Sequence, residues 1–217
     1  MALRNRNIFA MRRLCLGMIV LAGATNPATA RNKDWQITPS SPDAVIVMRA
    51  EPRRFDYMLV FSREGQSSFG GRSGLGVKSS ETAPYVARAV KPGTYKLNNL
   101  IQQKRWSTCF SSGTVEFTVQ PGKVYYLGTL NIMPLLDDLQ QSAAAKGKMM
   151  LRMDSSYLEW EPTVKPSFAA GTPEELAAVR AYVTTHMPMT TAPVEALAMG
   201  STTFSSTAAK RMLEVCG

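Results

Sequence analysis

The sequence predicts a mainly β fold, an antiparallel β-sandwich with a small α-helical appendage at its C-terminus. Short apolar runs rich in β-branched and aromatic residues follow one another between residues 43 and 132. Several of them alternate apolar and polar residues, as a strand with one face in the core does. Turn residues separate the runs at roughly 8–12-residue spacing, which is typical of sandwiches and barrels.

The first half of the chain supplies four predicted strands, in AVIVMRA (44–50), FDYMLVFSR (55–63), YVARAV (85–90) and TYKLNNL (94–100). The β-branched residues of the first run suit a buried strand. Residues 64–81, EGQSSFGGRSGLGVKSSE, are rich in Gly and Ser. This composition predicts a loop, or a loop that holds one short edge strand.

Three more strands are predicted in RWSTCFSS (105–112), TVEFTVQ (114–120) and KVYYLGTLNI (123–132). The second of these has the most regular alternation in the chain. In the third, both faces carry apolar residues, so we expect a central and largely buried strand. Strict alternation places one set of its residues on a single face: Val124, Tyr126, Gly128, Leu130 and Ile132.

Two Pro-Gly pairs, Pro92-Gly93 and Pro121-Gly122, each precede a predicted strand. Proline fixes φ at the first central position of a type II turn, and glycine supplies positive φ at the second. We expect each pair to form a hairpin or a sheet-crossing turn that sets the register of the strand after it. A slip of one residue would move every apolar side chain to the opposite face.

Helical signals appear only after the predicted sandwich, which we place at residues 43–160. Leu135, Leu136 and Leu139 indicate a short helix within 134–147. Thr172-Pro173-Glu174-Glu175 is a capping-box helix start, and that helix must end before Pro188. We therefore interpret residues 161–217 as a helical extension packed on the sandwich, with a last short helix at 207–215. Residues 189–206 fit no pattern.

Residues 1–30 have the layout of a secretory signal peptide. An arginine-rich start is followed by the apolar run LCLGMIVLAGA and then by small residues before Arg31. The apolar run is about half the roughly twenty residues that a membrane-spanning helix needs. We therefore predict a periplasmic or secreted protein with no membrane span after the signal is removed. An uncleaved N-terminal anchor is the alternative.

Cys109 and Cys216 are the two cysteines that follow the leader. In an oxidising compartment a pair so far apart suggests a disulfide that ties the C-terminus to the body. Such a loop could contribute up to roughly 4–5 kcal/mol. Two free thiols, one of them in a frayed tail, are the alternative.

The chain carries a net charge of +9, with 25 basic and 16 acidic side chains. Four arginines belong to the leader, and the remaining excess lies before Val124. A basic surface attracts anionic partners over about 10 Å. In the cell envelope these are acidic proteins, glycans and anionic lipid surfaces. The compartment and the lack of an interleaved basic and aromatic stripe argue against nucleic acid.

The segments PGTY (92–95) and FTVQPGKVYYLG (117–128) resemble a pattern in exported bacterial proteins of unknown function. Those proteins carry a small prealbumin-like, or carboxypeptidase-regulatory-like, β-sandwich. The resemblance covers residues 43–132 and implies the fold and an envelope location. It implies no catalytic residues.

Candidate chemistry in the sequence is sparse. His186, Met187 and Met189 offer the imidazole and thioether ligands that suit copper, but His186 is the only histidine. Residues 71–79 miss the P-loop pattern because Val77 separates the last glycine from Lys78. No G-x-S-x-G motif is present. Adjacent acids such as Asp137 and Asp138 are more often surface residues than a catalytic pair.

We therefore predict an exported, non-catalytic envelope protein that binds a partner protein, a glycan or a lipid surface and needs no cofactor. Candidate partner-binding residues are Arg72 and Lys78 in the Gly/Ser loop, and the aromatic residues Trp106 and Tyr125 if they lie on a face that is not fully covered. The alternative function is a small-ligand or copper carrier that uses His186, Met187 and Met189.

Overall fold

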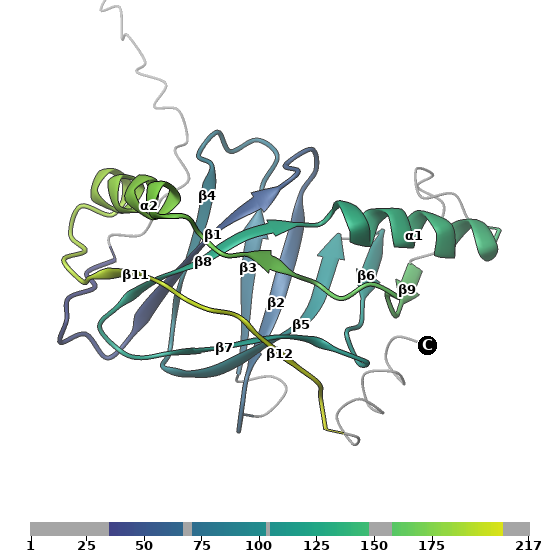
Figure 1. Cartoon of the computed structure of the whole chain (residues 1–217), viewed down its shortest axis with the longest axis horizontal. Helices are drawn as coiled ribbons and strands as arrows, with labels where there is room; N and C mark the ends of the chain where they lie inside the picture. The colour runs from purple at the N-terminus through teal and green to yellow at the C-terminus, as the bar shows by residue number, and fades with distance from the viewer. Residues whose placement is uncertain (1–34, 67–70, 103–104, 148–157, 206–217) are drawn as a thin grey trace, which may run out of the picture. The chain divides into compact units, whose positions relative to one another are not determined.

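The computed structural model describes residues 35–66, 71–102, 105–147 and 158–205 (Figure 1). The five strands of one sheet, in chain order, are β1 (Ala44–Glu51), β4 (Tyr85–Val90), β8 (Val124–Asn131), β10 (Phe168–Ala169) and β11 (Val194–Ala196). The seven strands of the other are β2 (Tyr57–Arg63), β3 (Arg72–Val77), β5 (Gly93–Gln102), β6 (Trp106–Thr108), β7 (Thr114–Val119), β9 (Leu158–Trp160) and β12 (Gly200–Thr202). The helices are α1 (Met133–Ala145) and α2 (Pro173–His186).

The predicted β-sandwich is confirmed, although its sheets are mixed rather than wholly antiparallel. In the five-stranded sheet the order is β4-β1-β8, and both β10 and β11 pair with the far edge of β8. The seven-stranded sheet runs β3-β2-β5-β7-β12, with β6 and β9 continuing from the end of β5. Most pairs are antiparallel, but β1 lies parallel to β8, β11 to β8, and β6 to β9.

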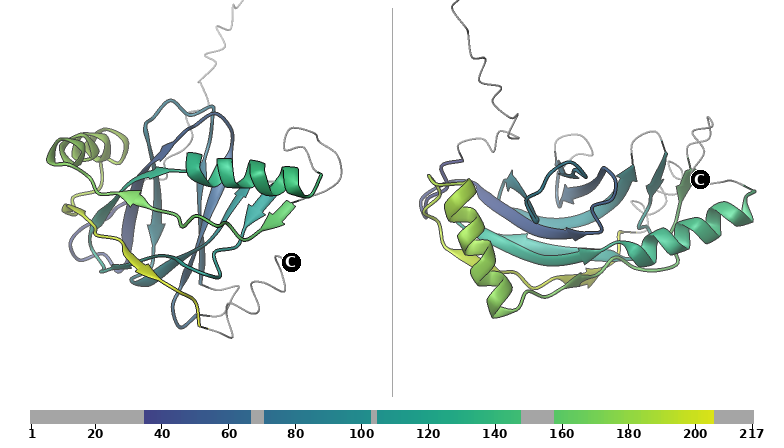
Figure 2. Two further views of the ribbon diagram at one scale, coloured as in Figure 1. Left: turned by 45° about the vertical axis from the view of Figure 1, so that its right-hand side comes forward. Right: turned by 90° about the horizontal axis from the view of Figure 1, so that it is seen from above.

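The main core lies between the two sheets. Inward-facing residues of both sheets form it, among them Ile46 and Met48 of β1, Leu59 and Phe61 of β2, and Phe117 of β7. Helix α1 continues from the end of β8 (Figure 2). Its buried leucines join the same core. A short helix was predicted at this place, and α1 confirms it.

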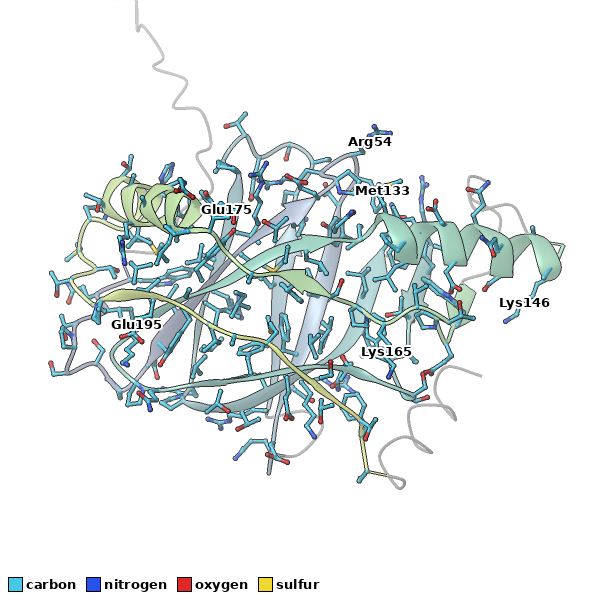
Figure 3. The ribbon with its side chains drawn as sticks, in the orientation of Figure 1. Arg54, Met133, Lys146, Lys165, Glu175 and Glu195 are labelled. Atoms are coloured by element: carbon cyan, nitrogen blue, oxygen red, sulfur yellow. The ribbon has the colours of Figure 1, made fainter. Side chains whose placement is uncertain are left out.

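Helix α2 covers the outer face of the five-stranded sheet. Its residues Val179, Tyr182 and Val183 form a second core with residues of β1, β4 and β8. The predicted capping box is present at the start of α2, where Figure 3 labels Glu175. The Glu175 amide donates to Thr172 Oγ1 at 3.2 Å, and the Thr172 amide donates to Glu175 Oε2 at 3.1 Å. Layers on both faces explain why β1 and β8 are apolar on both sides.

Strand β8 does not keep strict alternation, so our prediction for its faces is wrong beyond Gly128. Val124 and Tyr126 share one face, which is toward the α2 core, but Leu130 and Ile132 belong to the inter-sheet core. The register between β1 and β8 shifts at this point, and Gly128 has φ 91°. A β-bulge adds one residue to a strand and so exchanges the faces of the residues after it.

The C-terminal segment is part of both sheets rather than an appendage on one. After α1 and β9, strands β10 and β11 extend the five-stranded sheet, whereas β12 pairs with β7 of the other (Figure 1). An ion pair between Lys123 Nζ and Glu195 Oε2, at 3.0 Å, joins β11 to the start of β8. Figure 3 labels Glu195 on β11. The helix predicted at 207–215 and the leader lie outside the described residues.

Candidate anion-binding pocket

The two Pro-Gly pairs lie at the same end of the sandwich, on either side of Asp43. Pro92-Gly93 carries the chain from β4 in one sheet to β5 in the other, and Pro121-Gly122 carries it back from β7 to β8. Both are therefore sheet-crossing connections and not hairpins. The Gly122 amide donates to the Asp43 carbonyl oxygen at 2.9 Å, while Lys91 Nζ lies 2.7 Å from Asp43 Oδ1. Asp43 thus joins the two connections.

A pocket of about 150 Å³ opens beside the first connection, between the start of β3 and the end of β4. Its polar lining consists of Asp43, Arg63, Arg72, Ser73, Lys91 and Tyr95. Three of these side chains are cationic and one is a carboxylate, so the lining has a net positive charge. An anionic group that enters would be favoured by this field and could accept hydrogen bonds from several donors.

Arg63 is held in place by the Pro-Gly connection next to it. Its Nη1 donates to the Pro92 carbonyl oxygen at 3.3 Å. Its alkyl stem passes over Gly93, where an added Cβ would lie 2.9 Å from Arg63 Cδ. The connection therefore supplies both an acceptor for the guanidinium and the space for its stem.

Tyr95 forms the inner wall of the pocket. Its side chain is 2 % exposed and stacks on Phe117, and its hydroxyl donates to the Lys91 carbonyl oxygen at 2.6 Å. Burial raises the pKa of Tyr95, and the Arg63 cation and hydrogen bonds with Lys91 and Ser73 oppose that rise. The phenol therefore stays neutral near pH 7 and fixes the end of β4 against β5.

The two basic residues predicted for the Gly/Ser loop lie at opposite ends of β3. Arg72 begins the strand, is exposed and lines the pocket. Lys78 follows the strand and lies 3.4 Å from Asp56 Oδ2. Hydrogen bonds from Ser79 lower the pKa of Asp56, with a smaller contribution from Lys78. Arg72 is therefore part of the candidate site, and Lys78 belongs to a separate surface ion pair.

Trp106 and Tyr125 are core residues, so the expectation that they lie on an incompletely covered face is wrong. Trp106 is 3 % exposed and meets Trp160 edge-on, with ring centroids 5.7 Å apart. Tyr125 is 4 % exposed, and its hydroxyl accepts from the Gln120 amide at 3.2 Å. Strand β9 pairs with β6 and brings Trp160 against Trp106, a pairing that the spacing of the apolar residues did not indicate.

The three copper-ligand candidates have separate surroundings. His186 is exposed, stacks on Tyr182 and places Nδ1 3.1 Å from the Tyr182 carbonyl oxygen. Met187 is 2 % exposed and packs in the α2 core, whereas Met189 is exposed and its sulfur accepts from Gln36. Among the described residues no group of three His, Cys, Asp or Glu side chains could hold a metal ion.

The acidic residues near α1 have structural partners. Asp138 is buried and accepts from Trp160 Nε1 at 2.8 Å and from the Thr163 amide and hydroxyl. Glu161 accepts from the amides of Ser111 and Ser112 and from the Ser111 hydroxyl. Burial raises the pKa of Glu161, but these hydrogen bonds together lower it below its usual value. Both carboxylates stabilise the fold by satisfying nearby donors.

Arg63, Lys91 and Tyr95 are site residues that the sequence pattern did not predict. Arg63 lies about thirty residues before Lys91 and Tyr95 in the sequence, and the pairing of β2 with β5 places it opposite Tyr95. One signal was present: Lys91 directly precedes a Pro-Gly pair, and Tyr95 follows it by two residues. Cations at the ends of adjoining edge strands would have directed attention to this corner.

No protein-family model, curated protein or solved structure matches the chain. In the part of the chain that the structure describes, neither helix has the length and apolar character needed to cross a membrane.

Proposed function

We propose that the chain is an exported, non-catalytic binding module that holds an anionic group of an envelope component in the pocket at the end of its sandwich. The observation that carries the proposal is the excess of cations in the lining, where Arg63, Arg72 and Lys91 face one carboxylate, Asp43. The component could be a protein, a glycan or a lipid, since each presents carboxylate or phosphate groups.

The pocket suits an anionic group better than an apolar ligand. Its small volume matches one carboxylate or phosphate, and Ser73 adds a hydroxyl to the cationic donors. Arg72 is exposed and the Lys91 side chain is 63 % exposed, so both cations can reach a ligand from solvent. Because these charges are exposed, salt should weaken the binding strongly.

A titration of the mature chain, residues 31–217, with inorganic phosphate and with acetate tests the proposal. We expect amide chemical shifts to change at Ser73 and Lys91 and the affinity to fall at least about fivefold in Arg72→Gln. Lys78→Gln is the matched control, because it removes the same charge at the other end of β3 and should leave the affinity unchanged. Equal effects of the two substitutions, or no shifts at all, would overturn the proposal.

The proposed location depends on removal of the leader, which the Arg-rich start and short apolar run support. We expect the exported product to begin at Arg31 when its N-terminus is sequenced from the periplasmic or culture fraction. A product that retains residues 1–30 and sediments with membranes would support the anchored alternative.

We also propose the Cys109–Cys216 disulfide for the exported form. Cys109 is 1 % exposed, and its amide donates to the Trp160 carbonyl oxygen at 2.9 Å, so it provides a rigid attachment point; Cys216 lies outside the described residues. Peptide mapping without reduction should yield one linked pair of cysteine peptides. Removal of the bond by Cys216→Ser should lower the free energy of unfolding by about 2–4 kcal/mol. Two alkylatable thiols in the exported protein would refute the bond.

A further inference from the structure

We infer that the anionic group is the C-terminal carboxylate of an extended peptide, which pairs along the free edge of β3 and ends in the pocket. This inference rests on the proposed function and names its ligand.

Strand β3 is an edge strand whose outward backbone groups can be identified. It pairs with β2 in an unbroken antiparallel register from Tyr57↔Val77 to Ser62↔Arg72. The next pair, Arg63 with Gly71, is joined by a hydrogen bond from the Arg63 amide at 2.9 Å. Antiparallel residues alternate between facing their partner and facing away. The amide and carbonyl groups of Arg72, Gly74 and Gly76 therefore point away from β2.

Strand β4 of the other sheet comes within 8 Å of β3 between Cα atoms, but β3 itself has few of the features that normally block strand addition. Two of the three residues whose backbone groups point away from β2 are glycines, so no side chain of their own covers these amides and carbonyls. Gly76 is exposed, and an added Cβ there would meet no atom within 4 Å. The strand contains no proline and its pairing with β2 contains no bulge. Proline, bulges and inward-pointing charges are the usual protections of an edge.

The position of the pocket selects one direction and one end of the peptide. Strand β3 starts at Arg72 beside the pocket and runs away from it to Val77. A peptide antiparallel to β3 runs toward Arg72 and delivers its C-terminus to Arg63, Arg72 and Lys91. A parallel peptide would deliver an ammonium group to the same cations and be repelled. At about 3.3 Å per residue, roughly six residues span β3.

Further charge on this side of the molecule favours an acidic peptide. Strand β4 is the edge strand of the other sheet, and its Arg88 pairs opposite Ile46. Because Ile46 belongs to the inter-sheet core, Arg88 lies on the same side of the sheet, but its side chain is exposed. It adds a fourth cation to the side on which β3 and β4 form the sheet edges. Strand addition supplies affinity through the main chain, and charge at the peptide end supplies selectivity.

The test uses a library of random octapeptides tethered through their N-termini, prepared once with free C-terminal carboxylates and once amidated. The mature chain should select members of the free library. The best peptide, measured by fluorescence anisotropy, should bind at least about tenfold more tightly than its amide, and Arg72→Gln should reduce its affinity at least about fivefold.

Two substitutions at one position test the strand pairing. Gly76→Pro removes an outward amide that an edge strand does not need for its own fold, and it should weaken peptide binding at least about tenfold. Gly76→Ala keeps the amide and should stay within about twofold of wild type. Neither should change phosphate binding. If Gly76→Pro lowers the melting temperature substantially, a peptide N-methylated at positions that face β3 makes the same test without altering the protein.

The outcomes separate this inference from the proposed function. If phosphate binds but no free-carboxylate peptide does, or if amides bind equally well, the peptide assignment is wrong and the anion pocket stands. If Gly76→Pro and N-methylation both leave peptide affinity unchanged, the carboxylate is held without strand pairing and the inference fails. If neither phosphate nor acetate binds, the proposed function itself fails.

Discussion

The two Pro-Gly connections share their dipeptide, their end of the sandwich and their task of crossing between sheets, yet their surroundings differ. An added Cβ at Gly122 would lie 2.2 Å from the Pro39 carbonyl oxygen, so the second connection packs against backbone. An added Cβ at Gly93 would meet only the side chain of Arg63. The Pro121-Gly122 pair therefore has a role in the fold alone, whereas the Pro92-Gly93 pair has a role in both the fold and the candidate site.

Gly122→Ala should have the largest effect. The residue has φ 67°, a left-handed conformation that costs a non-glycine residue roughly 1–2 kcal/mol, and the Pro39 backbone cannot move aside as a side chain can. We expect urea denaturation to show a loss of about 3 kcal/mol or more.

Gly147→Ala is the matched control for Gly122→Ala. Gly147 has nearly the same φ, 66°, and an added Cβ there meets nothing within 4 Å. Gly147→Ala should therefore lower the free energy of unfolding only by the roughly 1–2 kcal/mol that the left-handed backbone conformation costs. Equal losses at the two glycines would mean that the Pro39 contact has no energetic weight and that the two connections are alike.

Gly93→Ala should cost less, about 1–2 kcal/mol, because its φ of 141° strains alanine but its neighbour is a flexible side chain. It should also weaken phosphate binding severalfold, since the Arg63 stem must move. In an Arg63→Ala background the same substitution should leave the remaining phosphate affinity unchanged, as a double-mutant cycle would show. Additive effects of the two substitutions on phosphate affinity would show that Gly93 does not act on the pocket through Arg63.

Lys91→Gln should lower stability by only about 0.5 kcal/mol, since its ion pair with Asp43 joins side chains that are 63 % and 34 % exposed. The Asp43 Oδ1 atom is buried, and its 2.7 Å contact with Lys91 lacks the alignment of a hydrogen bond. A double-mutant cycle with Asp43→Asn should give a coupling that disappears in molar salt. A coupling energy of several kcal/mol would contradict this expectation and would show that the Lys91–Asp43 ion pair is a major stabilising contact between the two connections.

Arg63→Gln should have the smallest effect on the free energy of unfolding. Its main effect should be on the pKa of Tyr95. Burial raises the pKa of Tyr95 above 10.0, so its neutral form favours folding below that pH, and this contribution is lost as pH rises through the folded pKa. Because Arg63 opposes the rise, its removal should move the Tyr95 absorbance transition at 295 nm to higher pH. Tyr95→Phe in both backgrounds identifies the transition, and a downward shift would contradict the assigned contact.

Much of the sandwich could be predicted because side-chain alternation reports directly on burial. Strand β4 begins and ends as predicted, and β7 buries Val115, Phe117 and Val119 on one face. Alternation failed where a bulge interrupts it at Gly128. It also gave no signal for β11 and β12, which have three residues each and form only because longer strands offer them an edge.

The candidate site was harder to predict than the fold. Arg72 was named for its loop composition, but a pocket lining requires knowing which strand ends meet. Trp106 and Tyr125 were named as candidates for an incompletely covered face because one strand alone does not show what covers its second face. In the structure, β9 and the opposite sheet cover them. Topology, which depends on contacts distant in sequence, is the information that the sequence pattern did not carry.

The contribution of the last quarter of the chain to both sheets bears on the proposed export. Strand β8 obtains its outer neighbours β10 and β11 from residues 168–196, and β7 obtains β12 from residues 200–202. A polypeptide that crosses a membrane from its N-terminus delivers these segments last. If the chain is exported as proposed, β8 keeps one unpaired edge until translocation is almost finished. A product shortened near residue 160 would present that edge to other chains and tend to aggregate.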